Sequence, residues 1–358
     1  MWAERASGGE VVCVPRGPRT VADRLKALLS KGHFSVLLGA GASACAGYPL
    51  MAALTEGVLA SLPRQEFALV HKWWDRVKGE AGANIETVLG KLYHLLDVCG
   101  TGVEKGEVKR CLAAVEEEIV RRFLPEKEIS VHRRLMVMVC HLNTKAPAVV
   151  ATSNYDLLVE RACEAEQVWC LDGFVGSCQR KWSVESLPLL MVTGGEHRRF
   201  RRHKKAVTLL KLHGSVSWAT DEDEIVAFPG GRVPEGGKWV RRLVYPTPRK
   251  VSESFGEPYS SLLRHFAGVT DRPNGLLVTL GFSYRDDHLV EPIKQFVSKP
   301  DHTLVALVQQ PEGSLGDLLK QENVICVAED KAWLEGRCSD DKLEIWRLPG
   351  LVDFLEEL

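Results

Sequence analysis

The chain has 358 residues, a length that favours two structural units or one large domain carrying an insertion. Its composition, with 45% hydrophobic and 26% charged residues, is that of an ordinary globular protein and excludes fibrous and disordered chains. The chain has 46 Lys and Arg and 47 Asp and Glu, so its formal net charge is -1. This balance excludes an overall electrostatic field that attracts nucleic acid or membranes.

The ten cysteines predict neither a zinc site nor a disulfide framework. No two of them form a C-x-x-C pair, and most lie in apolar stretches where a reduced thiol packs well, so we expect no metal. The N-terminus lacks the apolar core of a secretion signal, and no stretch approaches the roughly 18 apolar residues that span a bilayer. We therefore expect a cytoplasmic protein without membrane contact.

Apolar spacing in the first part of the chain predicts a helix at Val21–Leu29, a buried strand at Phe34–Leu38 and a second helix at Leu50–Leu62. From residue 63 to residue 143 nearly every stretch has helical periodicity, which predicts a helical insertion. Its expected helices are Phe67–Val77, Ile85–Val98, Val108–Phe123 and Val131–Leu142.

Short apolar runs, typical of buried strands, resume after residue 144 and alternate with helical segments. These runs are Ala148–Ala151, Val207–Leu212, Arg242–Tyr245, Gly275–Leu280, Thr303–Val308 and Val324–Val327. Strands that are apolar on both faces and alternate with helices indicate a parallel sheet covered on two sides. The predicted fold class is therefore α/β, a doubly wound, Rossmann-like sheet with helices on both faces. Leu343–Leu358 indicates a short strand and a closing helix.

These patterns divide the chain into four parts, with a flexible loop expected at Gly230-Gly231 and Gly236-Gly237. The Rossmann-like domain has two segments, and the insertion separates them. The parts are an N-terminal extension (1–19), the Rossmann-like domain (20–62 and 144–330), the helical insertion (63–143) and a C-terminal strand and helix (331–358).

A glycine-rich loop follows the first predicted strand. Gly39-Ala40-Gly41-Ala42-Ser43-Ala44 has the spacing G-x-G-x-x-A between a strand and a helix, which is the context of a dinucleotide site. Such glycines let backbone N–H groups approach a pyrophosphate at the positive end of a helix, although they also occur where two backbones pack closely. The acidic residue expected about 20 positions later has only the helical Glu56 as a candidate, which disfavours a hydride-transferring dehydrogenase.

Polar residues also follow three later strands, in the segments Thr152–Asp156, Lys211–Ser215 and Gly281–His288. The first two segments have a structural alternative, because Ser153 or Asn154 can cap the next helix and an isolated histidine such as His213 is more often a hydrogen-bonded structural residue. Ligands bind open α/β sheets at the carboxyl ends of strands. We therefore expect these strand ends to form one site.

Taken in order, these segments resemble the sirtuin-like superfamily, and especially its prokaryotic NAD-hydrolysing branch, over about residues 20–330. The resemblance rests on four family patterns, G-A-G-x-S-x-x-x-G-x-P, T-x-N-Y-D, K-L-H-G-S and G-Y-S-F-x-D. The matching segments are Gly39–Ser43 with Gly47-Tyr48-Pro49, Thr152–Asp156, Lys211–Ser215 and Gly281–Asp286, together with Ile85-Glu86 and Glu257-Pro258-Tyr259. Protein-deacylating sirtuins differ from this chain, because they follow the proline with D-F-R and carry a four-cysteine zinc ribbon.

The resemblance implies NAD as the substrate and gives roles to particular residues. Asn154 would orient the ribose or the attacking water, Asp156 would supply negative charge near the developing cation or fix Asn154, and His213 would be the general base. Ala40, Gly41 and Ser43 would hold the pyrophosphate, and Ser283 and Asp286 would lie on the ribose and adenosine side. The residues expected to bind NAD are Gly39, Ala40, Gly41, Ser43, Pro49, Thr152, Ser153, Gly281, Ser283 and Asp286.

The function implied by the resemblance is hydrolysis of NAD+ to nicotinamide and ADP-ribose, which depletes NAD+ in antiphage defence. A protein deacylase and a non-catalytic NAD-binding subunit are the alternatives. Because the core and insertion leave no room for a sensor domain, we expect control by assembly, as a homo-oligomer and with a HerA-like ATPase or an Argonaute-type protein. The basic run His197–Lys205 is either a solvated loop or, through Arg198–Lys205, a contact for nucleic acid or an acidic partner.

Overall fold

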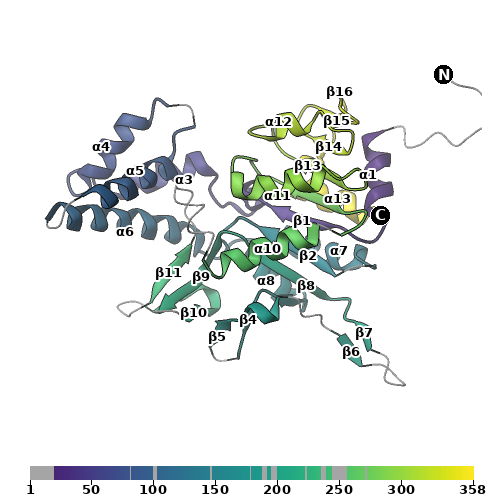
Figure 1. Cartoon of the computed structure of the whole chain (residues 1–358), viewed down its shortest axis with the longest axis horizontal. Coiled ribbons are helices and arrows are strands. Elements are labelled where there is room, and N and C mark those ends of the chain that lie inside the picture. The colour runs from purple at the N-terminus through teal and green to yellow at the C-terminus, as the bar shows by residue number, and fades with distance from the viewer. Residues whose placement is uncertain are drawn as a thin grey trace, which may run out of the picture.

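The computed structural model of the chain describes residues 20–80, 82–99, 103–145, 147–177, 179–187, 192–194, 200–221, 224–234, 239–243, 256–270 and 272–358. The expected N-terminal extension therefore lies outside the described residues. Within the described ranges, the centre of the molecule is a nine-stranded sheet with the order β16-β15-β14-β13-β12-β1-β2-β8-β3 (Figure 1). Its strands are β1 (Ser35–Leu38), β2 (Ala148–Thr152), β3 (Trp169–Leu171), β8 (Ala206–Lys211), β12 (Leu276–Leu280), β13 (Thr303–Leu307), β14 (Val324–Val327), β15 (Ala332–Leu334) and β16 (Arg337–Ser339).

All neighbouring strands from β14 to β3 pair in parallel, and only β15 and β16 are antiparallel. The fold class is thus the predicted α/β class with a large parallel sheet. The chain runs from β1 to β2 on one side and later crosses to β12 on the other side of β1. The carboxyl ends of β1, β2 and β12 therefore meet where the strand order reverses, the usual ligand position in open α/β sheets.

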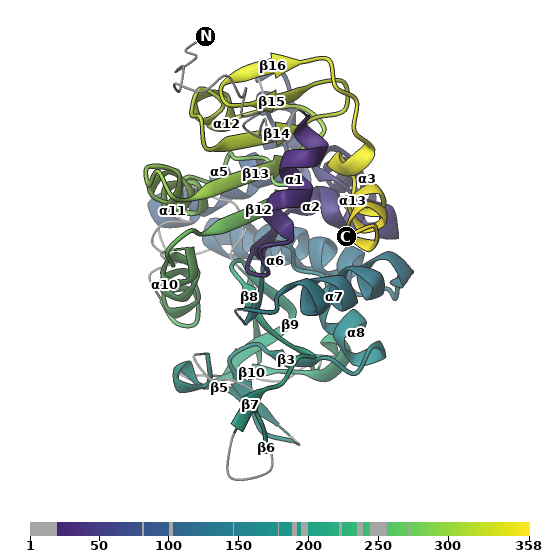
Figure 2. The ribbon, with the colours of Figure 1, turned by 90° about the vertical axis from the view of Figure 1, so that its right-hand side faces the viewer.

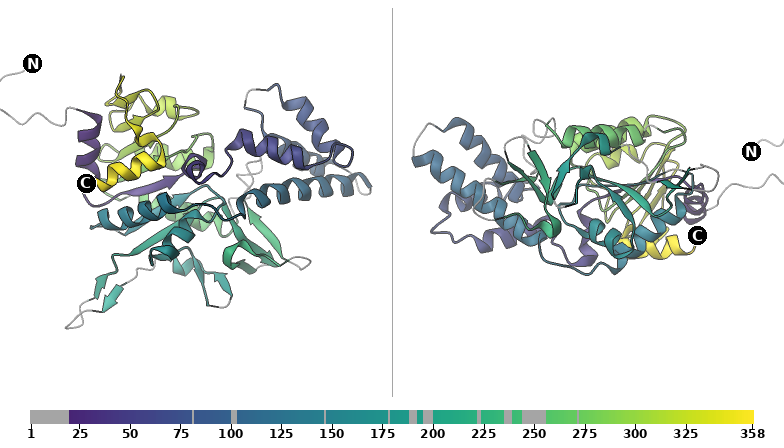
Figure 3. Two further views of the ribbon diagram at one scale, coloured as in Figure 1. Left: turned by 180° about the vertical axis from the view of Figure 1, so that it is seen from behind. Right: turned by 90° about the horizontal axis from the view of Figure 1, so that it is seen from below.

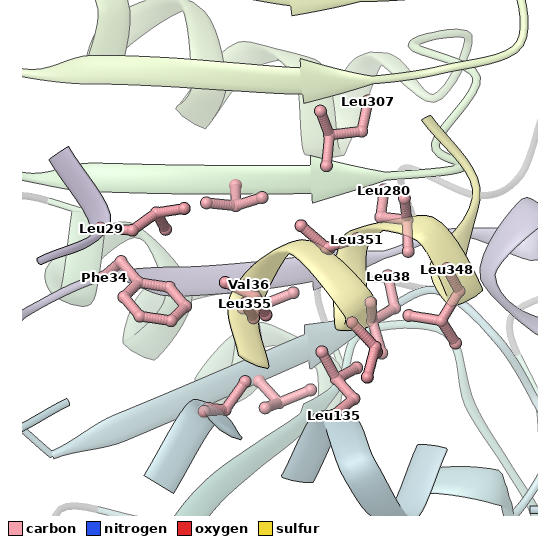
Figure 4. Packing of buried hydrophobic residues seen from close by; sticks show 14 of the residues in the cluster. Leu29, Phe34, Val36, Leu38, Leu135, Leu280, Leu307, Leu348, Leu351 and Leu355 are labelled. Atoms are coloured by element: carbon pink, nitrogen blue, oxygen red, sulfur yellow. The ribbon is translucent and has the colours of Figure 1, made fainter. Parts of the chain in front are cut away.

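Side chains alternate between the two faces of the sheet, and each face is buried by different helices. Val36 and Leu38 of β1 join a core with α1 (Val21–Leu29), α7 (Ser130–Leu142), α8 (Leu158–Ala165) and α13 (Leu348–Glu356). Figure 4 shows Leu348, Leu351 and Leu355, at helical spacing on α13, packed over this face. Burial of each such leucine contributes about 1.5–3 kcal/mol.

Leu37 points to the opposite face, which is covered by α10 (Tyr259–Thr270), α11 (Asp287–Val297), α12 (Leu315–Leu318) and part of a second sheet. Figure 2 shows α1, α7 and α13 on one side of the main sheet, with α10 and α11 on the other. The two-sided covering explains why the central strands are apolar throughout.

The second sheet is antiparallel, with the order β11-β9-β10-β5-β4. Its strands are β4 (Phe174–Val175), β5 (Arg180–Trp182), β9 (Gly214–Asp221), β10 (Glu224–Ala227) and β11 (Val240–Leu243). The prediction that Arg242–Tyr245 belongs to the parallel sheet is wrong, because this run overlaps β11, which pairs antiparallel with β9; Tyr245 itself lies outside the described residues. A short apolar run does not reveal which sheet it joins.

The basic run also lies partly outside the described residues. Arg198 and Arg199 are not described, whereas the following β7 (Phe200–Arg202) pairs antiparallel with β6 (Val192–Gly194). Figure 1 shows this pair extending away from the rest of the chain. Lys204 and Lys205, which end the basic run, are exposed.

Helices α3 (Met51–Ser61), α4 (Ala68–Val77), α5 (Ile85–Val98) and α6 (Val103–Phe123) form a third core beside the sheets, and Figure 3 shows them projecting from one end of the molecule. Asn84 begins α5, since its side chain accepts from the N–H groups of Glu86 and Thr87. α7, expected within the insertion, instead packs on the main sheet. The division into domains remains a proposal.

The C-terminal segment differs from its prediction in one detail. The expected strand near Leu343 is a 3-10 turn, η5 (Glu344–Trp346), while the closing helix is present as α13. None of the described helices is long and apolar enough to cross a membrane.

Candidate functional site

A cavity of about 1230 Å3 opens at the carboxyl ends of the central strands. Most of the residues predicted from the sequence line it. They are Gly39, Ala40, Gly41, Ser43, Pro49, Ser153, Asn154, Asp156, His213, Gly281, Ser283 and Asp286. Thr152 is buried and does not line the cavity; its hydroxyl donates to the Leu38 carbonyl at 2.9 Å and accepts from the Asn154 N–H at 3.0 Å.

The glycine loop is built by close contact between two strand ends. A Cβ atom on Gly39 would lie 2.4 Å from the Gly281 carbonyl oxygen, and one on Gly41 would lie 2.7 Å from the Gly281 Cα. The N–H groups of Gly39 and Gly41 donate to the carbonyls of Leu280 and Gly281. These glycines are therefore required for packing, and the Gly41 N–H expected to approach a pyrophosphate already has a protein acceptor.

Ser43 joins Asn154 and Asp156 in one hydrogen-bond network. The Ser43 hydroxyl donates to Asp156 Oδ2 at 2.7 Å and accepts from Asn154 Nδ2 at 2.8 Å. Asn154 Nδ2 also donates to the Gly39 carbonyl at 2.8 Å, and Asp156 Oδ1 accepts from the Leu158 N–H at 3.0 Å. Because an amide group has two N–H donors, Asn154 has only its carbonyl oxygen to offer a ligand.

An ion pair between Lys211 and Glu160 supports this network at the backbone of Asp156. Lys211, at the end of β8, is 1% exposed and lies 3.0 Å from Glu160 of α8. Its ammonium group also donates to the backbone carbonyl of Asp156. Burial raises the pKa of Glu160, and the charge of Lys211 opposes that rise. The pair thus ties the end of β8 to the turn that carries Asp156.

His213 follows β8 and is 4% exposed, and its Nε2 lies 3.0 Å from Nε2 of His288. The planes of the two rings are inclined by 29°, and their centroids are 5.0 Å apart. His288 is the second residue of α11, whose N-cap is Asp286. The sequence placed His288 in a polar strand end but gave it no role; only the fold brings it to His213.

The outer walls of the cavity come from segments that sequence reasoning did not assign to the site. Helices α3, α5 and α6 contribute a mainly apolar wall, which includes Leu54, Ile85 and Phe123, together with Glu86. The segment from η5 to α13 contributes Trp346 and Arg347. Of these residues, Ile85 and Glu86 belong to a segment that carries the resemblance but received no role in the site. The position of the others depends on how distant helices pack.

A profile of the SIR2-like domain matches residues 148–327, which is half of the chain. The chain belongs to the SIR2-like family. Members of this family are NAD-dependent enzymes, so NAD is the substrate or cofactor of this SIR2-like protein. The matched range includes β2, β8 and β12, and the cavity joins them to the Gly39–Ser43 turn, which precedes the range.

One solved structure similar to the SIR2-like chain is described as "Structural Basis for the Mechanism and Regulation of Sir2 Enzymes". The similarity covers 93% of this chain and 96% of that chain, with 16% sequence identity and a TM-score of 0.42. None of the curated proteins matches the chain. Within the described part of the SIR2-like protein, no group of three or more His, Cys, Asp and Glu is placed to hold a metal ion.

We expect His132 of α7 to make the SIR2-like fold sensitive to acid. It is 1% exposed, and burial lowers its pKa below the usual 6.5. The unfolded chain therefore binds a proton at this position below about pH 6.5 while the folded chain resists it, so stability falls as pH falls, by up to about 1.4 kcal/mol per pH unit. Urea unfolding at pH 7.5 and pH 5.5 measures this loss, and we expect it to be smaller in His132→Leu. An equal loss in both proteins would contradict the assignment.

Proposed function

We propose that this SIR2-like protein is an NAD+ glycohydrolase that breaks the bond between nicotinamide and ribose. The observation that carries the proposal is that Gly39, Asn154 and His213, at the ends of three different strands, line one cavity. Its volume of about 1230 Å3 exceeds the roughly 300–1,000 Å3 of common small-molecule sites, so it has room for a dinucleotide.

Asn154 and His213 would act on the attacking water. Nicotinamide leaves with the electron pair of its bond to ribose, because its ring nitrogen carries a formal positive charge, and the ribose becomes oxocarbenium-like. The carbonyl oxygen of Asn154 would accept a hydrogen bond from the water or a ribose hydroxyl. His213 would take the proton that the water loses as its oxygen bonds to the ribose carbon, a contribution of about a hundredfold or more.

Asp156 would position Asn154 rather than face the ribose cation. Of the two roles expected for it, positioning is supported by its hydrogen bonds, because both carboxylate oxygens accept from groups of the protein. Ser43 is the link between the two side chains. The reactive geometry would thus depend on the turn that follows β1.

The pyrophosphate would lie between that turn and the rim of the cavity. Since the N–H groups of Gly39 and Gly41 have protein acceptors, we assign the phosphate contacts to the Ala40 backbone and to Arg285. Arg285 lines the cavity and forms an exposed ion pair with Glu312 at 2.7 Å, a weak interaction that a phosphate can replace. Ser283 and Asp286 would be on the ribose and adenosine side.

Ser43→Ala is expected to lower the rate of nicotinamide release about tenfold, because Asn154 and Asp156 lose the hydroxyl that joins them. The free energy of unfolding should fall by about 1.5–3 kcal/mol, because the buried Asp156 carboxylate loses one donor and the Asn154 amide loses one acceptor. Steady-state kinetics and urea unfolding measure the two effects. Ser30→Ala is the matched control, since the Ser30 hydroxyl also donates a hydrogen bond, to the Lys26 carbonyl, but lies at the exposed end of α1. An unchanged rate in Ser43→Ala would contradict the role of the network.

Chromatographic product analysis of purified protein mixed with NAD+ alone tests the proposed activity. We expect nicotinamide and ADP-ribose in equal amounts. Turnover only when an acylated peptide is added would identify a deacylase. A cyclic product would show that the enzyme catalyses cyclisation and not hydrolysis. Binding without turnover, even with a HerA-like ATPase or an Argonaute-type partner present, would indicate a non-catalytic NAD-binding subunit.

In the cell, we propose that the enzyme depletes NAD+ during antiphage defence, under the control of assembly with itself and with a HerA-like ATPase or an Argonaute-type protein. The resemblance of the four strand-end motifs to the NAD-hydrolysing branch supports this role. Repeating the product analysis with the candidate partner tests it, and a rate that no partner changes would contradict it.

A further inference from the structure

The contact between His213 and His288 constrains the protons of both rings. Their Nε2 atoms are 3.0 Å apart, a hydrogen-bond distance. A neutral imidazole has one N–H and one acceptor nitrogen, and an imidazolium has two N–H groups. The contact is therefore a hydrogen bond only when one Nε2 carries a proton and the other does not. Two charged rings would place two N–H groups against each other.

The two histidines are not equivalent in their position. His213 is buried at the end of β8 and lines the cavity. His288 is only partly buried, lies on α11 and is not among the residues that line the cavity. His288 therefore contacts the base rather than the ligand, as a third group orients the base in other catalytic sites.

We propose that His288 is a positioning residue that fixes the tautomer and orientation of His213. In the resting protein the His213 Nε2–H donates to His288 Nε2, so the lone pair of His213 is on Nδ1. When His213 takes the proton of the attacking water at Nδ1, it becomes an imidazolium, and its Nε2–H keeps the same neutral acceptor in a stronger, charge-assisted bond. No proton leaves the pair in this step. The inference rests on the proposed function only in that the attacking water is the group that gives its proton to His213.

Two substitutions separate positioning from simple packing. His288→Leu removes the acceptor, and we expect kcat for nicotinamide release to fall about 10- to 100-fold, less than the roughly 10²- to 10⁴-fold contribution of a general base, with KM for NAD+ almost unchanged. His288→Gln places an amide oxygen close to the former Nε2 position, so it should restore most of kcat. His265→Leu is the matched control, because His265 is also partly buried, lies on the adjacent helix α10 and does not line the cavity.

NMR of protein with 15N-labelled histidine tests the inference even if NAD+ is not the substrate. In the wild type we expect His213 to carry its proton on Nε2, and we expect this tautomer to persist in His288→Gln and to be lost in His288→Leu. An unchanged His213 tautomer in His288→Leu would overturn the proposal. Full kcat in His288→Leu, or equally low kcat in the Gln and Leu variants, would also overturn it. A wild type that releases no nicotinamide would instead contradict the proposed function. The His213 tautomer would then test the role of His288 by itself.

Discussion

Asn154→Ala and His213→Ala are expected to abolish measurable nicotinamide release while the protein stays folded. Asn154 would lose the acceptor that orients the water, and His213 would lose the base, each effect being on the order of 10²- to 10³-fold or more. Both side chains line the cavity, after the ends of β2 and β8. Release of nicotinamide from NAD+ and thermal unfolding measure activity and folding separately.

The controls for this prediction are Gln295→Ala and His94→Ala. Gln295 carries an exposed amide on α11, and His94 is an exposed imidazole on α5. Neither lines the cavity, so both variants should keep the wild-type rate. Full activity in both Asn154→Ala and His213→Ala would reject the assignment of these residues.

Gly281→Ala is expected to disrupt the junction between the β1 and β12 strand ends and to destabilise the protein by about 3 kcal/mol or more. Gly281 has a φ of +62°, where a side chain costs roughly 1–2 kcal/mol. Its new Cβ would also lie 2.5 Å from the Gly41 Cα, and such overpacking costs a further 1–3 kcal/mol or so. Urea unfolding measures the loss, and binding of NAD+ should weaken because the Gly39–Ser43 turn must move.

Gly230→Ala separates the two causes. Gly230 has the same φ of +62°, but a Cβ there would meet nothing within 4 Å. Its cost should therefore be limited to the backbone strain of about 1–2 kcal/mol. Equal destabilisation by the two substitutions would mean that close contact of the two loops contributes nothing.

The parallel sheet and most helices follow from local patterns in the sequence. Helices α1 and α5 begin and end at the predicted residues, because each combines an apolar face with a side-chain cap, from Thr20 and Asn84. The second sheet could not be predicted in the same way. β9 mixes polar residues with Val216, Trp218 and Ala219, so it is not an apolar run, and it pairs with β10 and β11.

The site was predictable only where a residue follows a strand. Asn154, His213 and Ser283 do so, and the topology of a parallel sheet brings such positions to one edge. His288, Arg347 and the apolar wall other than Ile85 reach the cavity region through packing between distant segments, which no local sequence pattern predicts. The Gly41 N–H and both side-chain N–H groups of Asn154 already donate to protein acceptors, and this too depends on how the loops fold.

A crystal structure of the Asn154→Ala variant with NAD+ tests the central claim most directly. We expect a dinucleotide in the cavity, with its nicotinamide ribose near residue 154 and His213 and its pyrophosphate near Ala40 and Arg285. NAD+ bound elsewhere, or a cavity that stays empty at saturating NAD+, would contradict it.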